Sequence, residues 1–386
     1  MDALSGQGGH SSALSAAVAE VDLSALDHNL ELVRRRTAPG AEVLAVVKAN
    51  AYGHGLPRTA LHLESRGVRW FGVATPAEAL SLREGGLRAD VLLLSPVSEP
   101  AVVTELVAHG VTLTVPGEEA LAAVAAADLP AEARVHLKLD TGMGRIGART
   151  PAEAARLAAS AARTRGVRVT GVYTHLYASE EEDERPTLAQ LELFDAMVAA
   201  MRAAGVEPGL RHVANSGAVF RFPSHHYELV RPGIVLYGYY PGPLVAALAP
   251  GLRPAMRLTA PVSFVKRVPP GTTVSYGGLW HAERETVVAT VRAGYADGYR
   301  RSLTGRARVG YRGRLLEVIG RVCMDQLMVD ATGADVAVGE RVVLWGPGGP
   351  SAEELGEAIG TVSYEMLTGV AARVGRTYVE ELPPLY

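Results

Sequence analysis

Lys48 stands at the end of a near-continuous apolar run, EVLAVV (residues 42–47), and is followed by the turn-rich stretch ANAYGHG. Only three of the 38 Lys and Arg residues are lysines, namely Lys48, Lys138 and Lys266. Because the chain uses arginine for nearly all its positive charge, a retained lysine favours amine chemistry: a guanidinium stays protonated and forms no Schiff base. The alternative is a solvated lysine at a strand end, where charged residues are usually found.

Other polar residues also stand directly after apolar, β-rich runs. They are Lys138 with Asp140, Arg145 in the stretch that follows, His175, and Asn215 with Ser216. Taken singly, His175 is compatible with a structural histidine, and Asn215-Ser216 fits a helix N-cap. Taken together they favour a site, provided that the runs end at one edge of a sheet.

The β-rich runs recur with a regular rhythm, and amphipathic segments rich in Ala, Leu and Glu separate most of them. The weakest helical connection is SGAVFRF, after residue 213. Eight strand–helix steps in about 240 residues predict a (β/α)8 barrel, in which catalytic groups gather at the C-terminal ends of the strands. The alternation alone also permits an open doubly wound sheet. The predicted strands are Val43–Val47, Trp70–Val73, Val91–Leu94, Val111–Val115, Val135–Leu139, Val167–Tyr173, Leu210–Val213 and Ile234–Tyr237.

The texture of the sequence changes after Pro241. Runs such as RLTAPVSFVKRV, TVVATVRAG and ERVVLWG are separated by PPGT, GG and GPGGP, which indicates a mostly β domain with one or two late helices. We therefore predict an α/β chain with a small polar disordered tail at residues 1–12, a barrel at 13–242 and a β domain at 243–386.

Composition excludes several functional classes. The net charge of −3 and the lack of a basic run argue against nucleic acid as a partner. The single cysteine, Cys323, fits a reducing compartment and an apolar packing role. Because no apolar stretch has transmembrane length and the start lacks the features of a signal peptide, we expect a cytoplasmic protein without membrane contact. There is no P-loop, HExxH or CxxC pattern, so no metal site is predicted.

The stretch GMGRIG at residues 142–147 matches the spacing G-x-G-x-x-G. A dinucleotide-binding loop would open a helix within the motif and would be followed by an acidic residue at the end of the next strand. Here the helix is expected only after Thr150-Pro151, and the next strand ends in VYT. We therefore reject an NAD site. What remains is a barrel enzyme with a desolvated amine, which describes an aldolase as well as a pyridoxal phosphate enzyme.

A family resemblance separates these two possibilities. The stretches VVKANAYGHG, HLKLDTGMGRIG, YTHL, ANS, VRPGIVLYG, VSYGG, RAGYADG, GRVCMDQ and SYE, in this order, resemble the bacterial alanine racemases from about Ala19 to near the C-terminus. The resemblance implies a pyridoxal 5'-phosphate enzyme that racemises alanine and supplies D-alanine for peptidoglycan. It also implies a homodimer with active sites shared between subunits, and a first strand near residues 18–23 that joins the C-terminal domain.

The resemblance further implies a two-base mechanism. Lys48 would hold the cofactor as a Schiff base and act on one face of the substrate Cα, and Tyr276 would act on the other. Two groups are needed because one base returns the proton to the side from which it took it. Arg231 would face the pyridine nitrogen, where a permanent cation donates a hydrogen bond without giving up its proton, which disfavours transamination.

The remaining roles are implied in the same way. The phosphate would be bound by Tyr52, Ser216, Gly233, Ile234 and Tyr364; His175 and Asn215 would lie at the cofactor ring; and Arg145, Met324 and Tyr295 would line the substrate side. Lys138 stands where many family members carry a carbamylated lysine, which would turn repulsion from Arg145 into attraction. The alternative for Lys138 is a neutral, desolvated amine, and the alternative for Tyr364 is a half-buried structural tyrosine.

The sequence departs from the family pattern after His175, where Leu176 and Glu180 stand in HLYASEEEDE. A barrel-type decarboxylase would be expected to have a glycine-triplet phosphate loop and an acidic partner for the ring nitrogen, where this chain has Arg231. A non-catalytic pyridoxal phosphate carrier would resemble the barrel alone, without the β domain that carries Tyr276. A racemase of broader specificity remains an open alternative.

Overall fold

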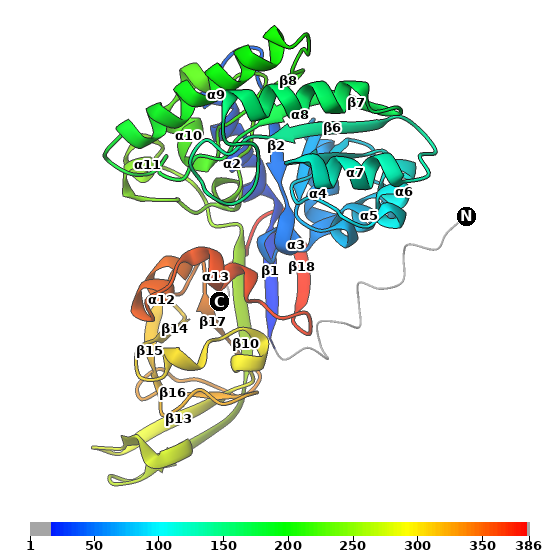
Figure 1. The fold of residues 1–386 in the computed structure, drawn as a ribbon. Coiled ribbons are helices and arrows are strands. Elements are labelled where there is room, and N and C mark those ends of the chain that lie inside the picture. The colour runs from blue at the N-terminus through cyan, green and yellow to red at the C-terminus, as the bar shows by residue number, and fades with distance from the viewer. Residues whose placement is uncertain (1–16, 384–386) are drawn as a thin grey trace. The chain divides into compact units, whose positions relative to one another are not determined.

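The computed structural model describes residues 17–383 (Figure 1), so the predicted tail at residues 1–12 lies outside the described part of the chain. Contacts divide the chain into two compact units. The barrel unit comprises Leu26–Ala51 and Gly55–Arg253. The β unit comprises the described residues up to Ala25, the short segment Tyr52–His54, and the described residues from Pro254 onward.

The barrel unit contains a parallel sheet whose order, among the described residues, is β8-β7-β6-β5-β4-β3-β2-β9. Its strands are β2 (Glu42–Val46), β3 (Trp70–Val73), β4 (Asp90–Leu93), β5 (Val111–Val115), β6 (Ala133–Lys138), β7 (Val167–Tyr173), β8 (Leu210–His212) and β9 (Leu229–Val230). The pairing of β2 with β9 joins the first strand of this sheet to the last. The amide of Arg231 donates to the carbonyl of Ala214 at 2.8 Å, and that of Glu228 to Arg211 at 3.2 Å. These bonds link the β8 and β9 segments, which confirms the predicted barrel over the open sheet.

The predicted position of the last barrel strand was wrong. Ile234–Tyr237 forms a 3-10 helix, η2, and the strand is β9, at Leu229–Val230. The chain leaves the sheet at Pro232-Gly233, because proline has no N–H for a strand ladder and Gly233 adopts φ −117°, ψ −94°. Both segments are short, apolar and buried, and hydrophobicity alone does not tell a strand from a helix at that length.

Helices connect the strands of the barrel unit. Several begin at sequence signals typical of helix N-termini: Thr75 and Glu78 form a capping box at α5, and Thr150 caps α8 through the amide of Glu153. Helices α8 and α9 lie side by side (Figure 1). In the described residues, no helix is both long and apolar enough to cross a bilayer. The helices are α2 (Leu23–Arg36), α3 (Lys48–Tyr52), α4 (Leu56–Ser65), α5 (Pro76–Glu84), α6 (Pro100–Ala108), α7 (Glu118–Ala126), α8 (Pro151–Arg163), α9 (Arg185–Ala203), α10 (Ser216–Arg221), η1 (Pro223–His225) and α11 (Pro243–Leu248).

Helix α11 follows the predicted domain boundary at residue 242 but belongs to the barrel unit by its contacts. The guanidinium of Arg36, in α2, donates to the carbonyl of Leu248 at 2.7 Å. The side chain of Asn29, also in α2, donates to the carbonyl of Arg253 at 2.8 Å and accepts from its amide. These bonds hold the segment after residue 242 against α2 as far as Arg253.

The β unit is built on a sheet with the order β13-β16-β15-β14-β17-β10-β1-β18. Strand β1 (Val18–Asp22) pairs antiparallel with β10 and parallel with β18. The other strands are β10 (Met256–Val268), β13 (Thr286–Val291), β14 (Arg308–Tyr311), β15 (Arg314–Ile319), β16 (Leu327–Asp330), β17 (Arg341–Trp345) and β18 (Gly375–Val379), with a separate hairpin of β11 (Thr273–Val274) and β12 (Trp280–His281). Short helices complete the unit: η3 (Tyr276–Gly278), η4 (Tyr295–Asp297), η5 (Arg301–Leu303), α12 (Ala352–Ala358) and α13 (Ser363–Thr368).

Candidate active site

The predicted site residues of the barrel unit gather at the C-terminal ends of its strands. Lys48 follows β2, Lys138 ends β6, His175 follows β7, Asn215 and Ser216 follow β8, and Arg231 follows β9. Hydrogen bonds show that these strand ends meet, since the Arg231 guanidinium reaches Thr174 after β7 and Val213 after β8. This edge is where TIM-barrel enzymes carry their active sites. We call it the C-terminal rim.

The segment after Lys48 has an unusual backbone. Ala49, Asn50 and Ala51 have φ values of 54°, 56° and 53° with ψ near 50°, so this turn is left-handed. For residues with a Cβ such a conformation costs about 1–2 kcal/mol each. The amide of Ala51 donates to the carbonyl of Val47 at 2.8 Å, and the side-chain oxygen of Asn50 accepts from the amide of Leu56 at 2.8 Å. These bonds offset part of the strain, and strain of this kind concentrates at functional sites.

Glu78 links this turn to helix α5. One carboxylate oxygen closes the capping box by accepting from the amides of Ala74 and Thr75, at 2.9 and 3.2 Å. The other accepts from the amide of Asn50 at 3.3 Å. Glu78 therefore places a negative charge beside Asn50, two residues after Lys48. The sequence analysis missed this role, since the capping motif announces the helix but not its neighbour.

The environment of Lys48 favours a neutral amine. Burial, followed by repulsion from Arg145, lowers the pKa of Lys48; attraction by Glu78 opposes this, and Arg231 adds to the lowering. A lysine with a lowered pKa has a larger fraction of the unprotonated form, which is the nucleophile in Schiff-base formation. The exposed Arg145 thus acts on Lys48 through its charge, as the predicted clustering requires.

Arg231 is buried and held on several sides. One terminal nitrogen donates to the carbonyl of His212 at 2.7 Å, and the other to that of Thr174 at 2.8 Å. The terminal nitrogens also lie 3.1 Å from Nδ1 of His212 and 3.3 Å from Nδ1 of His175. Burial lowers the pKa of Arg231 to about 10, so the group remains a cation at neutral pH. Arg231 is therefore a fixed positive charge at the rim.

Lys138 is buried in the same region. Its Nζ donates to the carbonyls of Leu139 and Ile146 and lies 5.5 Å from the centre of the Tyr173 ring. Burial, followed by repulsion from Arg231, lowers the pKa of Lys138 to about 7. The amine is thus available in its neutral form near neutral pH, which both the desolvated and the carbamylated interpretations require.

The segments after β8 and β9 are joined through Ser216. Its hydroxyl accepts from the amide of Gly233, which precedes Ile234 at the start of η2, at 2.9 Å. The side chain of Asn215 caps α10 by accepting from the amide of Ala218, and its Nδ2 donates to the carbonyl of Leu176 at 3.1 Å. The N-cap interpretation of Asn215 is therefore confirmed. Its side-chain amide also attaches to the rim the loop after His175, where the sequence departs from the family pattern.

The remaining predicted residues belong to the β unit. The amides of Tyr295 and Ala296 donate to the carbonyls of Cys323 and Met324, both at 3.0 Å, so the predicted substrate-side residues Tyr295 and Met324 are brought together. Tyr276 lies in η3 and is 68% exposed. Separately, the rings of Tyr52 and Tyr364 lie 6.1 Å apart, which joins two predicted phosphate ligands that are distant in sequence.

The sequence analysis missed the polar layer beneath Arg231. His136 and His212 are fully buried, and their rings are joined by a hydrogen bond of 2.9 Å between Nδ1 and Nε2. A signal was present: His136 and Lys138 are two residues apart on β6, so their side chains point to the same face. His212 is the buried last residue of β8 (LRH), and a buried imidazole needs a partner.

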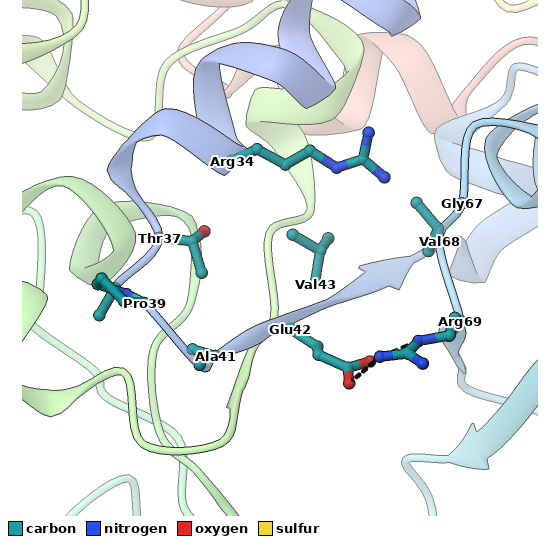
Figure 2. Close-up of a pocket in the computed structure, with 11 residues that line it drawn as sticks. Arg34, Thr37, Pro39, Ala41, Glu42, Val43, Gly67, Val68 and Arg69 are labelled. Atoms are coloured by element: carbon teal, nitrogen blue, oxygen red, sulfur yellow. Dashed lines mark hydrogen bonds and ion pairs between the residues drawn. The ribbon is translucent and has the colours of Figure 1, made fainter.

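A cavity of about 340 Å³ opens beside Glu42 and Val43 at the amino end of β2 (Figure 2). Lys48 follows the opposite end of this strand. Its charged side chains already have partners within the protein: Arg69 pairs with Glu42, and Arg34 donates to the backbone carbonyl of Arg66 at 2.6 Å. The amino end of a barrel contributes to stability rather than to catalysis. We therefore assign the site to the C-terminal rim and not to this cavity.

Comparison with known proteins identifies the family of this chain. The family model described as the alanine racemase N-terminal domain matches residues 21–241, and the model of the C-terminal domain matches residues 255–378. The chain belongs to the alanine racemase family. Both matches run through the motifs that carry the resemblance, and together they include the predicted catalytic residues Lys48 and Tyr276.

Relatives in the alanine racemase family match nearly the full chain. The alanine racemase of Deinococcus radiodurans is 44% identical over 365 residues, which cover 94% of this chain and 99% of the relative. That of Desulfovibrio desulfuricans is 40% identical over 365 residues, covering 94% and 98%. The crystal structure of alanine racemase from D-cycloserine-producing Streptomyces lavendulae aligns with a TM-score of 0.88 at 39% identity, covering 95% and 98%. The alanine racemase of Clostridium difficile 630 aligns with a TM-score of 0.90 at 32% identity, covering 96% and 97%.

Proposed function

We propose that this chain interconverts L-alanine and D-alanine with pyridoxal 5'-phosphate as cofactor, by a two-base mechanism. Membership of the alanine racemase family makes the chain an isomerase of the class that depends on pyridoxal phosphate. The observation that carries the proposal is the amine of Lys48, whose pKa is lowered at a barrel rim that also holds Arg231. An amine of this kind forms a Schiff base, and the neighbouring cations suit an anionic cofactor and a carboxylate substrate.

The residues present fit the cofactor. Bound pyridoxal phosphate supplies an aldehyde for attachment and a ring that withdraws electrons from the substrate Cα. Among the residues of this chain, Lys48 would provide the attachment, and Arg231 would face the ring nitrogen. The phosphate would be bound by Tyr52, Ser216, Gly233, Ile234 and Tyr364; His175 and Asn215 would lie at the ring; and Arg145, Met324 and Tyr295 would contact the substrate.

Lys48 and Tyr276 are the proposed proton-transferring groups. Each would act on one face of Cα, so that one removes a proton while the other donates one. The lowered pKa of Lys48 increases the fraction of the neutral amine, which is the form that accepts a proton.

Arg231 is proposed to determine reaction specificity. Its pKa of about 10 means that it donates a hydrogen bond at neutral pH but retains its proton. A cofactor ring nitrogen facing Arg231 would therefore stay unprotonated, which would disfavour protonation on the cofactor relative to Cα. Restricting the fate of the proton in this way favours racemisation over transamination.

We also infer that two copies of the chain share each site. Large apolar side chains are exposed on the β unit near the predicted substrate residues: Tyr276 is 68%, Leu279 58% and Met324 52% exposed. Exposed apolar groups of this size are typical of surfaces that pack against a partner. In the proposed homodimer, Tyr276 of one copy serves the cofactor on Lys48 of the other.

Carbamylation of Lys138 is proposed on chemical grounds. Carbon dioxide adds to a neutral amine to give a carbamate, and the amine releases one proton to the solvent; the pKa of about 7 supplies the neutral amine at physiological pH. The resulting anion would offset the repulsion among Lys138, Arg145 and Arg231. Nuclear magnetic resonance of protein equilibrated with ¹³C-bicarbonate tests this proposal: a carbamate signal that disappears in Lys138→Ala supports it, and the lack of any such signal in the wild type refutes it.

The experiment that tests the activity is incubation with individual L-amino acids, followed by chiral chromatography. We expect D-alanine from L-alanine, with little product from larger amino acids. Comparable rates with several larger amino acids would favour the alternative, a racemase of broader specificity. The proposed role in supplying D-alanine for peptidoglycan requires D-alanine to be the main product.

A further inference from the structure

A line of polar aromatic side chains crosses the barrel interior beneath Arg231. His136 on β6 and His212 on β8 are both fully buried. Nδ1 of His136 lies 2.9 Å from Nε2 of His212, and Nδ1 of His212 lies 3.1 Å from a terminal nitrogen of Arg231. Barrel interiors are usually filled by branched apolar residues, so two linked imidazoles at this depth require an explanation.

The direction of these hydrogen bonds follows from arginine chemistry. A guanidinium only donates, so Nδ1 of His212 must accept and carries no proton. Burial, and then repulsion from Arg231, lower the pKa of His212 well below its usual range, so the ring is neutral and its proton is on Nε2. That proton is donated to Nδ1 of His136. The hydrogen bonds are therefore all donated in one direction, from Arg231 to His212 and from His212 to His136.

Aromatic packing holds the His212 ring in its plane. The ring of Tyr173 stacks on it with centroids 4.8 Å apart and planes 6° apart. The Tyr173 hydroxyl is itself bonded to the hydroxyl of Thr114 at 2.9 Å and to the carbonyl of Leu94 at 3.2 Å. Because Tyr173 is fixed at its far end, the His212 ring has little freedom to turn away from Arg231.

The outer edge of His136 fits against a glycine. A Cβ at Gly171 would lie 2.5 Å from Nε2 of His136 and 2.6 Å from its Cδ2 and Cε1. Such distances are far below van der Waals contact, so any side chain at position 171 would displace the imidazole. The space for the His136 ring is thus provided by the lack of a side chain on the neighbouring strand.

We propose that His212 and His136 are positioning residues that hold Arg231 in one orientation through this one-way hydrogen-bond chain. A carboxylate in place of His212 would also bind Arg231 but would neutralise it, whereas a neutral imidazole fixes the guanidinium and leaves its full charge at the rim. His136 accepts the Nε2 proton of His212 and so holds that ring in the orientation that Arg231 requires. The inference deepens the proposed function, since it rests on the role proposed there for Arg231.

The proton positions can be measured without substrate. In protein labelled with ¹⁵N-histidine, we expect His212 to show a directly bonded proton on Nε2 only, and the same for His136. His212 is assigned by comparison with His212→Asn. A proton on Nδ1 of His212, or protons on both nitrogens, would overturn the proposal even if the protein is a fully active racemase. Conversely, an inactive protein with the expected proton positions would overturn the proposed function and leave the proposed series of hydrogen bonds standing.

Two variants of His136 separate positioning from packing. Asn keeps an acceptor close to the position of Nδ1, and Leu has a similar size but no acceptor. In His136→Leu we expect the His212 signal to change and both cofactor affinity and racemase rate to fall about 10-fold, the lower end of the effect typical when the hydrogen-bonded partner of a ligating imidazole is removed. In His136→Asn we expect recovery toward the wild-type values. Equal behaviour of the two variants would refute a role for the acceptor.

Gly171→Ala tests the same chain from the neighbouring strand. The added methyl group should displace the His136 ring, although neither histidine is substituted. The His212 signal should therefore change as it does in His136→Leu. Gly117→Ala is the matched control, because a Cβ at Gly117 meets nothing within 4 Å and its backbone is extended. An unchanged His212 signal in Gly171→Ala would contradict the proposed contact.

Discussion

The proposed active-site residues of the two units differ in how firmly the chain holds them. In the barrel unit, Arg231 is 4% exposed and its terminal nitrogens are bonded to carbonyls and imidazoles. In the β unit, Tyr276 is 68% exposed and lies in a short 3-10 helix after Ser275, whose φ is 69°. The barrel unit therefore arranges the electrostatics of the site by itself. The base proposed on the β unit, Tyr276, would depend on what packs against it, as a site shared between two copies requires.

The largest expected effect concerns the barrel unit. Lys48→Ala should abolish borohydride-stable attachment of pyridoxal phosphate and lower the racemase rate by roughly 10⁴-fold or more, because both the nucleophile and one base are lost. Mass spectrometry after reduction and chiral chromatography measure the two outcomes. Lys266→Ala, a lysine on β10, is the control and should retain both properties. Covalently attached cofactor in Lys48→Ala would refute the assignment of Lys48 as the attachment residue.

Tyr276→Phe tests the β unit. We expect a loss of roughly 10²–10⁴-fold, the usual contribution of a general acid–base group, with cofactor attachment unchanged. When Tyr276→Phe and Lys48→Ala are dissociated, mixed and reassociated, random pairing makes half of the dimers mixed. One of the two sites in each mixed dimer is then intact, so about a quarter of the wild-type activity should return. A verified heterodimer without activity would refute the shared site.

Arg231→Glu probes the fixed charge. A carboxylate can share a proton with the ring nitrogen, which an arginine does not, so racemisation should fall by about 10²-fold while conversion of the cofactor to pyridoxamine phosphate rises. Chromatography of the released cofactor measures the side reaction. Arg231→Lys keeps a cation but loses the planar donor set, and it should lower the rate without raising transamination. An unchanged side reaction in Arg231→Glu would place the arginine away from the ring nitrogen.

Lys138 should give a pH-dependent stability. Its folded-state pKa is about 7, below the ordinary value of 10.5, so between these values the unfolded chain binds more protons than the folded one. The free energy of unfolding therefore rises with pH across this window. In carbon-dioxide-free buffer, the wild type should gain stability relative to Lys138→Met from about pH 7 to pH 10. Parallel curves in urea titrations would show that the Lys138 pKa is not lowered.

The smallest effect is expected at the opposite end of the barrel. Arg69 is exposed and pairs with Glu42 beside the cavity of Figure 2. Exposed ion pairs contribute about 0–1 kcal/mol, so Arg69→Ala should change the free energy of unfolding by no more than this and leave the racemase rate unchanged. A large loss of rate would mean that the amino end of the barrel communicates with the rim.

The sequence by itself determined the repeating strand and helix pattern, the ends at which Lys48, Lys138 and His175 stand, and the motifs of the family. These features are local: side-chain periodicity and the position of a residue after an apolar run can be read within a dozen residues. The small number of lysines could be interpreted for the same reason, since it depends on the chemistry of residue types and needs no knowledge of contacts.

Only the tertiary structure decided the features that depend on distant partners. The left-handed turn at Ala49–Ala51 contradicts the local preference of alanine and persists because Asn50 bonds Leu56 and Glu78. Leu229–Val230 and Ile234–Tyr237 are both apolar, but only Leu229–Val230 pairs with β2 and forms a strand. His136 and His212 are 76 residues apart, and neither histidine shows by its position in the sequence that it pairs with the other. Local patterns carry no information about such pairings, because their energy comes from contacts that exist only after the barrel has closed.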